Sequence, residues 1–138
     1  MLFRSLARTQ SEESPVYYIQ MAHARLSGIF RVGNVDPATV TGEGVDWGVL
    51  AEAEERELVK ALLDWPTLVA GAAEALEPHR VATWLLDTAR LVHLWYHKHH
   101  VLGEPEPVMR ARLALARAAR ITLANALGVL GIAAPERM

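Results

Sequence analysis

The 138-residue sequence contains no cysteine, so neither a disulfide framework nor a thiolate zinc site can form. It also lacks the roughly 18 uninterrupted apolar residues that a membrane-spanning helix needs, and its first residues show no long apolar run followed by a small-residue cleavage site. These absences lead us to expect a soluble, cytoplasmic protein that does not interact with a membrane.

Catalytic motifs are missing as well. The sequence has no glycine-rich loop that would cradle a phosphate, no G-x-S-x-G elbow and no H-E-x-x-H zinc motif, so we expect no catalytic residue, cofactor or metal site in this chain. His93 and His97 have a four-residue spacing that can share a metal ion, but no carboxylate lies at helical spacing beside them. We interpret the paired acids Glu54 and Glu55 as part of a solvated helix face.

The apolar content, in contrast, is that of one folded domain. Hydrophobic residues make up 51% of the chain and charged residues 22%. The net charge of −2 conceals an asymmetry, because residues 1–78 hold 12 acids and 6 bases whereas residues 79–138 hold 4 acids and 8 bases. The electropositive half is compatible with an anionic partner such as RNA, and equally with two helices that face each other across the core.

The apolar residues recur at helical spacing along most of the chain, without the sustained alternation typical of a strand. Ser14-Pro15 is typical of a helix start, Asp46 is a candidate cap, Pro66 is expected to break or kink a helix, and Glu77-Pro78 marks a second break. We predict an all-α, antiparallel bundle of four to five helices over residues 14–138, preceded by residues 1–13 as the tail of an earlier helix or a linker. The predicted helices span residues 16–31, 47–64, 67–76, 79–101 and 108–127.

Four side-chain rings gather near the C-terminal end of the helix predicted over residues 79–101. His93, Tyr96, His97 and His100 occupy a flank beside its apolar stripe. Unpaired RNA bases stack on such rings, and each stack contributes about 1–3 kcal/mol. Spacing alone leaves open the alternative that Tyr96 is a boundary core residue with its hydroxyl in water.

Several motifs resemble those of one enzyme family. Residues 14–25, S-P-V-Y-Y-I-Q-M-A-H-A-R, resemble the N-P-V-Y-Y-V-Q-Y-A-H-A-R segment that opens the C-terminal domain of arginyl-tRNA synthetases. Residues 78–86 resemble the family's P-H-x-x-x-x-Y-L segment, residues 95–97 its F-Y-x, and residues 130–138 its terminal L-G-[IV]…P-x-x-M. The resemblance, which runs from about residue 10 to residue 138, implies a helical anticodon-binding domain of the DALR type.

The resemblance also implies a class I arginine–tRNA ligase, in which this domain grips the anticodon loop of tRNA-Arg while a separate domain activates arginine with ATP. The HIGH-like and KMSKS-like signatures of such catalytic domains are absent from the sequence. We therefore expect a domain cut from a longer protein and ending where the family ends. Its expected partners are the tRNA-Arg anticodon stem-loop and the missing catalytic domain, not DNA, and alone it should bind tRNA without charging it.

The positions that match the family's motifs give five candidate RNA contacts. Met21 and Arg25 stand where the family's first helix approaches the anticodon, Tyr96 and His100 where a later helix does so, and Met138 at the terminus. Met21 replaces a common tyrosine and offers no hydroxyl, and His100 replaces a tryptophan found in some relatives.

Other interpretations of single residues stay open at this point. The alternative for Arg25 is an ion pair with an acid of the bundle. His23 is predicted to be a packed, hydrogen-bonded core histidine rather than a ligand. Arg117 and Arg120 are weaker candidates for contacts with the phosphate backbone, since outward arginines on a final helix are usually solubilising.

A function of another class is a free-standing helical module that binds a partner protein or a second copy of itself. Its support would be an exposed apolar segment at Leu2, Phe3 and Leu6, because exposed apolar patches promote association.

Overall fold

A computed structural model describes residues 14–138, and within them it contains helices and connectors but no strand. The predicted all-α fold is confirmed. The assignment of residues 1–13 as a tail or linker, and the apolar segment within it, lie outside the described residues. The helices are α2 (Pro15–Gly33), α3 (Ala53–Glu74), α4 (His79–Lys98) and α5 (Glu106–Val129), with 3-10 turns η1 (Pro37–Thr39) and η2 (Trp47–Val49).

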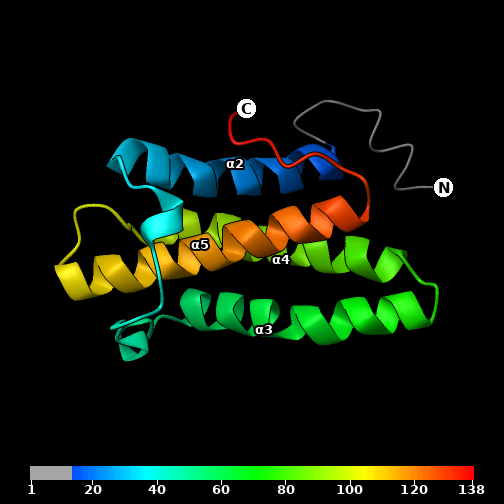
Figure 1. Ribbon diagram of the computed structural model, residues 1–138, viewed down its shortest axis with the longest axis horizontal. Helices are drawn as coiled ribbons and strands as arrows, with labels where there is room; N and C mark the ends of the chain where they lie inside the picture. The colour runs from blue at the N-terminus through cyan, green and yellow to red at the C-terminus, as the bar shows by residue number, and fades with distance from the viewer. Residues whose placement is uncertain (1–13) are drawn as a thin grey trace.

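The four α-helices form an antiparallel bundle in which each helix reverses the direction of the one before it (Figure 1). Helices α4 and α5 lie in the middle. Helix α2 packs on both from one side and α3 packs on both from the other. No helix of the described part of the chain is long and apolar enough to cross a membrane.

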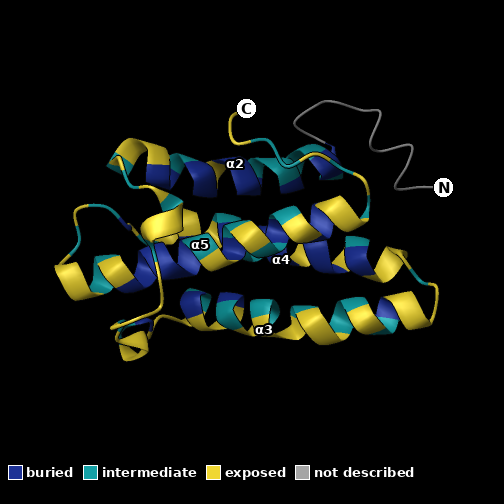
Figure 2. Ribbon diagram, in the orientation of Figure 1, coloured by how far each residue is buried: buried dark blue, intermediate teal, exposed yellow. Residues whose placement is uncertain are grey.

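The core lies along the inward faces of all four helices, drawn dark blue in Figure 2. Burying one large aliphatic or aromatic side chain contributes about 1.5–3 kcal/mol, so a row of them on each helix drives the packing. The apolar stripe predicted on α4 is buried throughout, which confirms that prediction. Its members are Val81, Trp84, Leu85, Thr88, Val92 and Trp95.

The predicted start of the first helix is also confirmed. Ser14 is the N-cap of α2, its hydroxyl accepts a hydrogen bond from the Tyr17 amide at 3.4 Å, and Pro15 occupies the first turn. The helix ends at Asn34, which adopts a left-handed conformation (φ 53°) that its short polar side chain tolerates.

The helix predicted over residues 47–64 starts later than expected. Asp46 does cap a helical turn, because its carboxylate accepts from the Gly48 amide at 3.0 Å, but that turn is only the short η2. Leu50, at φ −81° and ψ 65°, then leaves the helical region and buries its side chain in the core. Helix α3 therefore begins only at Ala53.

Of the break or kink predicted at Pro66, the break is wrong, because α3 continues through Pro66 to Glu74 and merges the two helices predicted there. An interior proline costs a helix about 3 kcal/mol through its missing N–H and a steric clash. Packing against α4 compensates for this cost. The Trp84 indole donates to the Ala61 carbonyl at 3.0 Å, and the Trp65 and Trp84 rings lie 4.7 Å apart.

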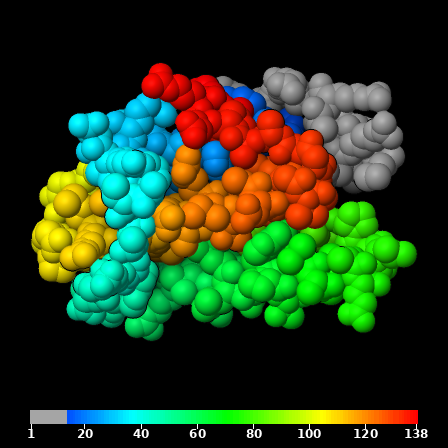
Figure 3. Space-filling model, viewed as in Figure 1, coloured from blue at the N-terminus to red at the C-terminus, as the bar shows by residue number. Residues whose placement is uncertain are grey.

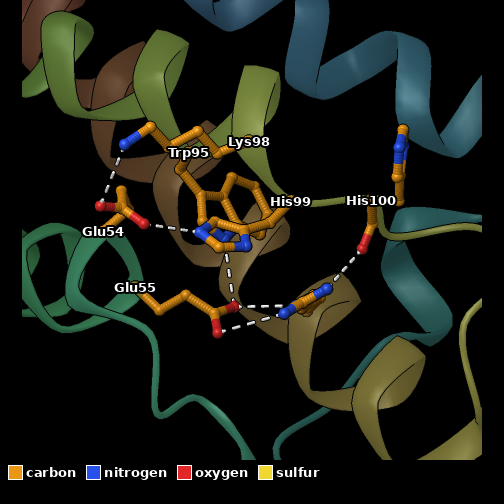
Figure 4. Close-up of polar contacts among 7 residues, drawn as sticks. Glu54, Glu55, Trp95, Lys98, His99 and His100 are labelled. Carbon is orange, nitrogen blue, oxygen red and sulfur yellow. Dashed lines mark hydrogen bonds and ion pairs between the residues drawn. The ribbon is translucent and has the colours of Figure 1, made fainter.

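The interpretation of Glu54 and Glu55 as a solvated face is wrong for Glu55, which is fully buried. Its carboxylate accepts hydrogen bonds from Arg112 Nε at 2.9 Å and from the Trp95 indole at 3.1 Å, as Figure 4 shows. A buried charge needs a partner and hydrogen bonds, and Arg112 and Trp95 supply both. Glu54 is partly buried and pairs with His99 at 2.7 Å and Lys98 at 3.8 Å.

Candidate functional site

A groove of about 750 Å³ opens between α2, the C-terminal end of α4 and the last residues of the chain. All five residues predicted to contact RNA line it, although they come from three separate parts of the sequence. Its full lining is Met21, Ala24, Arg25, Gly28, Ile29, Arg31, Val32, Tyr96, His97, His99, His100, Val101, Leu102, Arg137 and Met138.

The predicted residues reach the groove from α2, from the C-terminal end of α4 with the residues after it, and from the end of the chain. Met21 and Arg25 are one helical turn apart on α2, and Tyr96 lies on α4 directly after the fully buried Trp95. His100 follows the end of α4, and Met138 is the last residue. Tyr96 is 40% exposed and Met138 51% exposed, so both present apolar surface to an incoming ligand.

Arg25 is oriented by two rings of α4. Its Nη1 donates to His93 Nδ1 at 2.9 Å, and its guanidinium carbon lies 5.5 Å from the centroid of the Tyr96 ring, within the range of a cation–π contact. His93 in turn donates from Nε2 to the Tyr18 carbonyl at 3.0 Å and packs its ring 4.4 Å from that of Tyr18. The carboxylate pair that sequence left open for Arg25 is absent from residues 14–138, where its partners are His93 and Tyr96.

The C-terminal segment, residues 132–138, forms a strap that lies over α2 in the space-filling view of Figure 3. Side chains of α2 hold it by its main chain: Gln20 Nε2 donates to the Ala133 carbonyl at 3.0 Å, His23 Nδ1 to that of Pro135 at 2.8 Å, and Arg31 Nη1 to that of Glu136 at 3.3 Å. These three donors lie on one stripe of α2. The strap therefore follows the helix and delivers Arg137 and Met138 to the groove.

His23 is buried and hydrogen-bonded, as predicted. Burial lowers the pKa of His23, with the nearby Arg120 acting in the same direction against the hydrogen bond to Pro135. Arg120, a weak candidate for phosphate, bonds instead to the Ser27 hydroxyl at 2.9 Å and to the Glu136 carboxylate at 2.9 Å. In the structure it therefore fastens the strap to α5. Arg117 is partly buried on the same helix.

The segment that carries His100 is fixed from the other side. Arg112, already paired with the buried Glu55, donates through Nη1 to the His100 carbonyl at 2.7 Å. Figure 4 shows this carbonyl facing the buried pair while the His100 imidazole points away from it. The ion pair thus links the core of the bundle to one wall of the groove.

The charge of the groove is one-sided. Three arginines line it, together with three histidines, and among residues 14–138 no aspartate or glutamate side chain lines it. The arginines are Arg25, Arg31 and Arg137. A concave surface with charges of one sign concentrates ligands of the other sign, so the groove favours an anion with flat apolar parts.

The metal site considered for His93 and His97 is not supported. Both ring nitrogens of His93 already bond to Tyr18 and Arg25, which leaves no lone pair for an ion. In the described residues another group, Glu52, Glu54 and His99, has ligand atoms within 4.8 Å of one another. His99 Nε2 donates to Glu54 at 2.7 Å, and this hydrogen bond is the main cause that lowers the pKa of Glu54. The Glu54 carboxylate thus has His99 and Lys98 as partners, so its charge is balanced by protein groups.

Comparison with known proteins decides the family. Residues 19–138 match the model of the DALR anticodon-binding domain. The chain belongs to this family. The chain is 46% identical to the arginine–tRNA ligase of Moorella thermoacetica over 138 residues, an alignment that covers 96% of this chain and 24% of that protein. It is 44% identical over 134 residues to the arginine–tRNA ligase of Geotalea daltonii, with the same coverage. The DALR domain spans about a quarter of the length of these curated relatives.

Solved structures agree. The arginyl-tRNA synthetase of Thermus thermophilus superposes with a TM-score of 0.75 at 34% identity, over 94% of this chain and 22% of that one. A crystal structure from Campylobacter jejuni gives a TM-score of 0.80 at 22% identity, over 97% of this chain and 29% of that one, which supports the fold alone. The predicted resemblance to the anticodon-binding domain of arginyl-tRNA synthetases is confirmed.

Several groove residues of the DALR domain were not predicted. Arg137 directly precedes Met138, so adjacency could have indicated it. Arg31 lies six residues after Arg25 near the end of α2, a spacing that does not place the two on one helix face, so no pattern in the sequence indicated Arg31. The roles of His93 and Gln20 had no comparable signal. Their contacts join residues 68 or more positions apart in the sequence.

Proposed function

We propose that the groove binds the anticodon loop of tRNA-Arg, and that this DALR domain is the RNA-binding part of an arginine–tRNA ligase. The observation that carries the proposal is the convergence of Met21, Arg25, Tyr96, His100 and Met138 on one groove, which three arginines line and to which the described residues contribute no acid. Membership of an anticodon-binding family supports tRNA as the class of ligand, and the similarity to arginine–tRNA ligases supports tRNA-Arg as the particular tRNA.

The chemistry of the lining suits an unpaired RNA loop. The exposed face of Tyr96 and the imidazole of His100 offer surfaces on which bases stack, and the thioethers of Met21 and Met138 pack against base faces without demanding one hydrogen-bonding pattern. Arg25, Arg31 and Arg137 supply N–H donors for phosphates. In this proposal the arginines hold the backbone, while the rings and the donors beside them distinguish the bases.

The chemical step belongs elsewhere in this proposal. A catalytic domain outside this chain would bind ATP and arginine and transfer arginine to the far end of the tRNA. The DALR domain would supply the grip on the anticodon that directs the enzyme to its tRNA. Alone, it is expected to bind RNA without aminoacylating it.

The test is binding of a fluorescent anticodon stem-loop with an arginine anticodon, alongside a stem-loop with altered loop bases, at two salt concentrations. Phosphate attraction weakens with salt whereas base recognition depends on the loop sequence, so the two terms separate. We expect the arginine loop to bind more tightly at both salts. Tyr96→Ala should lower its affinity by about 1–3 kcal/mol and remove the preference.

Equal, weak binding of both loops that vanishes with salt would contradict the proposal. The mass of the protein in solution at rising concentration would then test the alternative, a module that associates with itself.

A further inference from the structure

The hydrogen bonds of His93 define the state of its ring. The Tyr18 carbonyl can only accept a hydrogen bond and the Arg25 guanidinium can only donate one. Contacts from Nε2 to Tyr18 at 3.0 Å and from Arg25 to Nδ1 at 2.9 Å therefore require a neutral ring with its proton on Nε2. The main chain of α2 thus selects the tautomer that leaves Nδ1 free to accept from Arg25.

Arg25 is left with donors to spare. A guanidinium has five N–H groups in a planar fork, and His93 Nδ1 accepts a hydrogen bond from only one of its nitrogens, Nη1. Arg25 is exposed, lines the groove and lies over the Tyr96 ring, and among residues 14–138 it forms no ion pair with a carboxylate. Its charge is oriented without being neutralised.

We infer that His93 is a positioning residue for RNA binding: as the neutral Nε2–H tautomer it holds the Arg25 guanidinium beside the Tyr96 ring, so that the remaining N–H groups of Arg25 meet a phosphate next to the base that stacks on Tyr96. This inference rests on the proposed function of the groove. It assigns a role to a residue whose own ring does not line the groove.

Lowering the pH should break the hydrogen bond between Arg25 and His93. A proton on Nδ1 converts the acceptor into a donor that faces a guanidinium, so the hydrogen bond is lost and two positive charges meet. The titratable and charged groups that face His93 from α2 are Tyr18 and Arg25, and Tyr96 and His97 are its neighbours on α4. Burial, and then the charge of Arg25, lower the pKa of His93 and preserve the neutral form.

The test is a double-mutant cycle read by binding of the arginine anticodon stem-loop to the 138-residue chain. If His93 acts through Arg25, then His93→Leu and Arg25→Ala should each weaken binding about tenfold, and the double variant should be no weaker than Arg25→Ala alone. His93→Gln should restore much of the affinity, because its amide offers one acceptor and one donor. His79→Leu is the matched control, since this exposed histidine lies about 21 Å away along α4.

Additive losses in the double variant would overturn the inference, and so would His93→Leu that binds like the unmodified protein. Either result leaves the proposed function standing, whereas failure of the unmodified protein to bind the stem-loop removes the proposed function itself. The cycle therefore separates the two.

Two further measurements apply if His93→Leu fails to fold. As the pH falls, the ratio of the Kd of Arg25→Ala to that of the unmodified protein should shrink, because a protonated His93 no longer holds Arg25 in the unmodified protein. The ratio isolates this effect, since the other groups of the groove are the same in both proteins. Nitrogen NMR of the labelled histidines should find the proton of His93 on Nε2. A constant ratio, or a proton on Nδ1, would overturn the inference.

Discussion

Two arginines of this protein illustrate opposite uses of the same side chain. Arg112 lies inside the bundle, where the buried carboxylate of Glu55 neutralises it and the His100 carbonyl takes a further donor. Arg25 lies at the groove, where a neutral imidazole and an aromatic face hold it. The charge of Arg112 is neutralised inside the fold, whereas the charge of Arg25 is oriented but not neutralised. The nature of the partner thus separates a structural arginine from one that is proposed to bind RNA.

The largest effect is expected from breaking the internal pair. Arg112→Met should lower the free energy of unfolding by about 3–5 kcal/mol, because it leaves the Glu55 carboxylate buried without its counter-charge. Urea denaturation measures this loss. Arg90→Met is the control, since the exposed Arg90–Asp87 pair should contribute no more than about 1 kcal/mol. A loss in Arg112→Met no larger than in the control would contradict the structural role of the pair.

A second change would make the groove arginine resemble the internal one. Met21→Glu places a carboxylate one turn before Arg25 on α2, a favourable arrangement for a helical ion pair worth about 0.2–0.5 kcal/mol. Stability should therefore hardly change. Binding of the arginine stem-loop should fall at least about tenfold, because Arg25 is neutralised and a negative charge faces the phosphates. Met21→Gln controls for the loss of the thioether, and equal binding by both variants would show that the charge of Arg25 is not used.

The contacts of α2 with His93 and of His23 with the strap should make the stability of the protein depend on pH. The pKa values of His93 and His23 are lowered in the folded protein, chiefly by burial, so the unfolded chain binds more protons below the ordinary value of 6.5. The stability that these histidines contribute is fully present above that value and is lost as the pH falls through their folded pKa values. Melting temperatures between about pH 7.5 and about pH 5.5 should fall, and less steeply in His93→Gln. An unchanged slope in that variant would assign the whole effect to other groups.

The smallest effect is expected from removing Arg25 itself. Arg25→Met should change the free energy of unfolding by at most about 1 kcal/mol, the contribution of an exposed cation–π contact, although it removes one of the three arginines that line the groove. Denaturation of this variant beside Arg112→Met completes the comparison. A loss as large as that of the internal arginine would mean that Arg25 serves the fold.

The sequence predicted the helices better than the contacts between them. Apolar spacing located the four α-helices of residues 14–138 and the buried stripe of α4, because that signal is local and repeated. The failures at Pro66 and Glu55 have a common cause. Each was interpreted from its own helix, whereas the outcome depends on a partner elsewhere: Trp84 for the proline, and Arg112, 57 positions later, for the acid.

The candidate site shows the same division. Resemblance to a family gave Met21, Arg25, Tyr96, His100 and Met138, and the structure brings all five to one groove, while their contact with RNA stays a prediction. The supports behind them had no sequence signal. The strap is held mainly through main-chain carbonyls, which every residue possesses, so no side-chain pattern in residues 132–138 could have indicated its course.

That mode of attachment has an evolutionary consequence. Because Gln20, His23 and Arg31 bind the backbone of the strap, Arg137 and Met138 can be substituted without changing its path. The stripe on α2 and Glu136, which pairs with Arg120, cannot be substituted as freely. Substitutions at the strap's last two residues, Arg137 and Met138, would change the side chains that line the groove while the helices of the bundle keep their packing. At these two positions, natural selection can therefore change the lining of the groove without changing the fold.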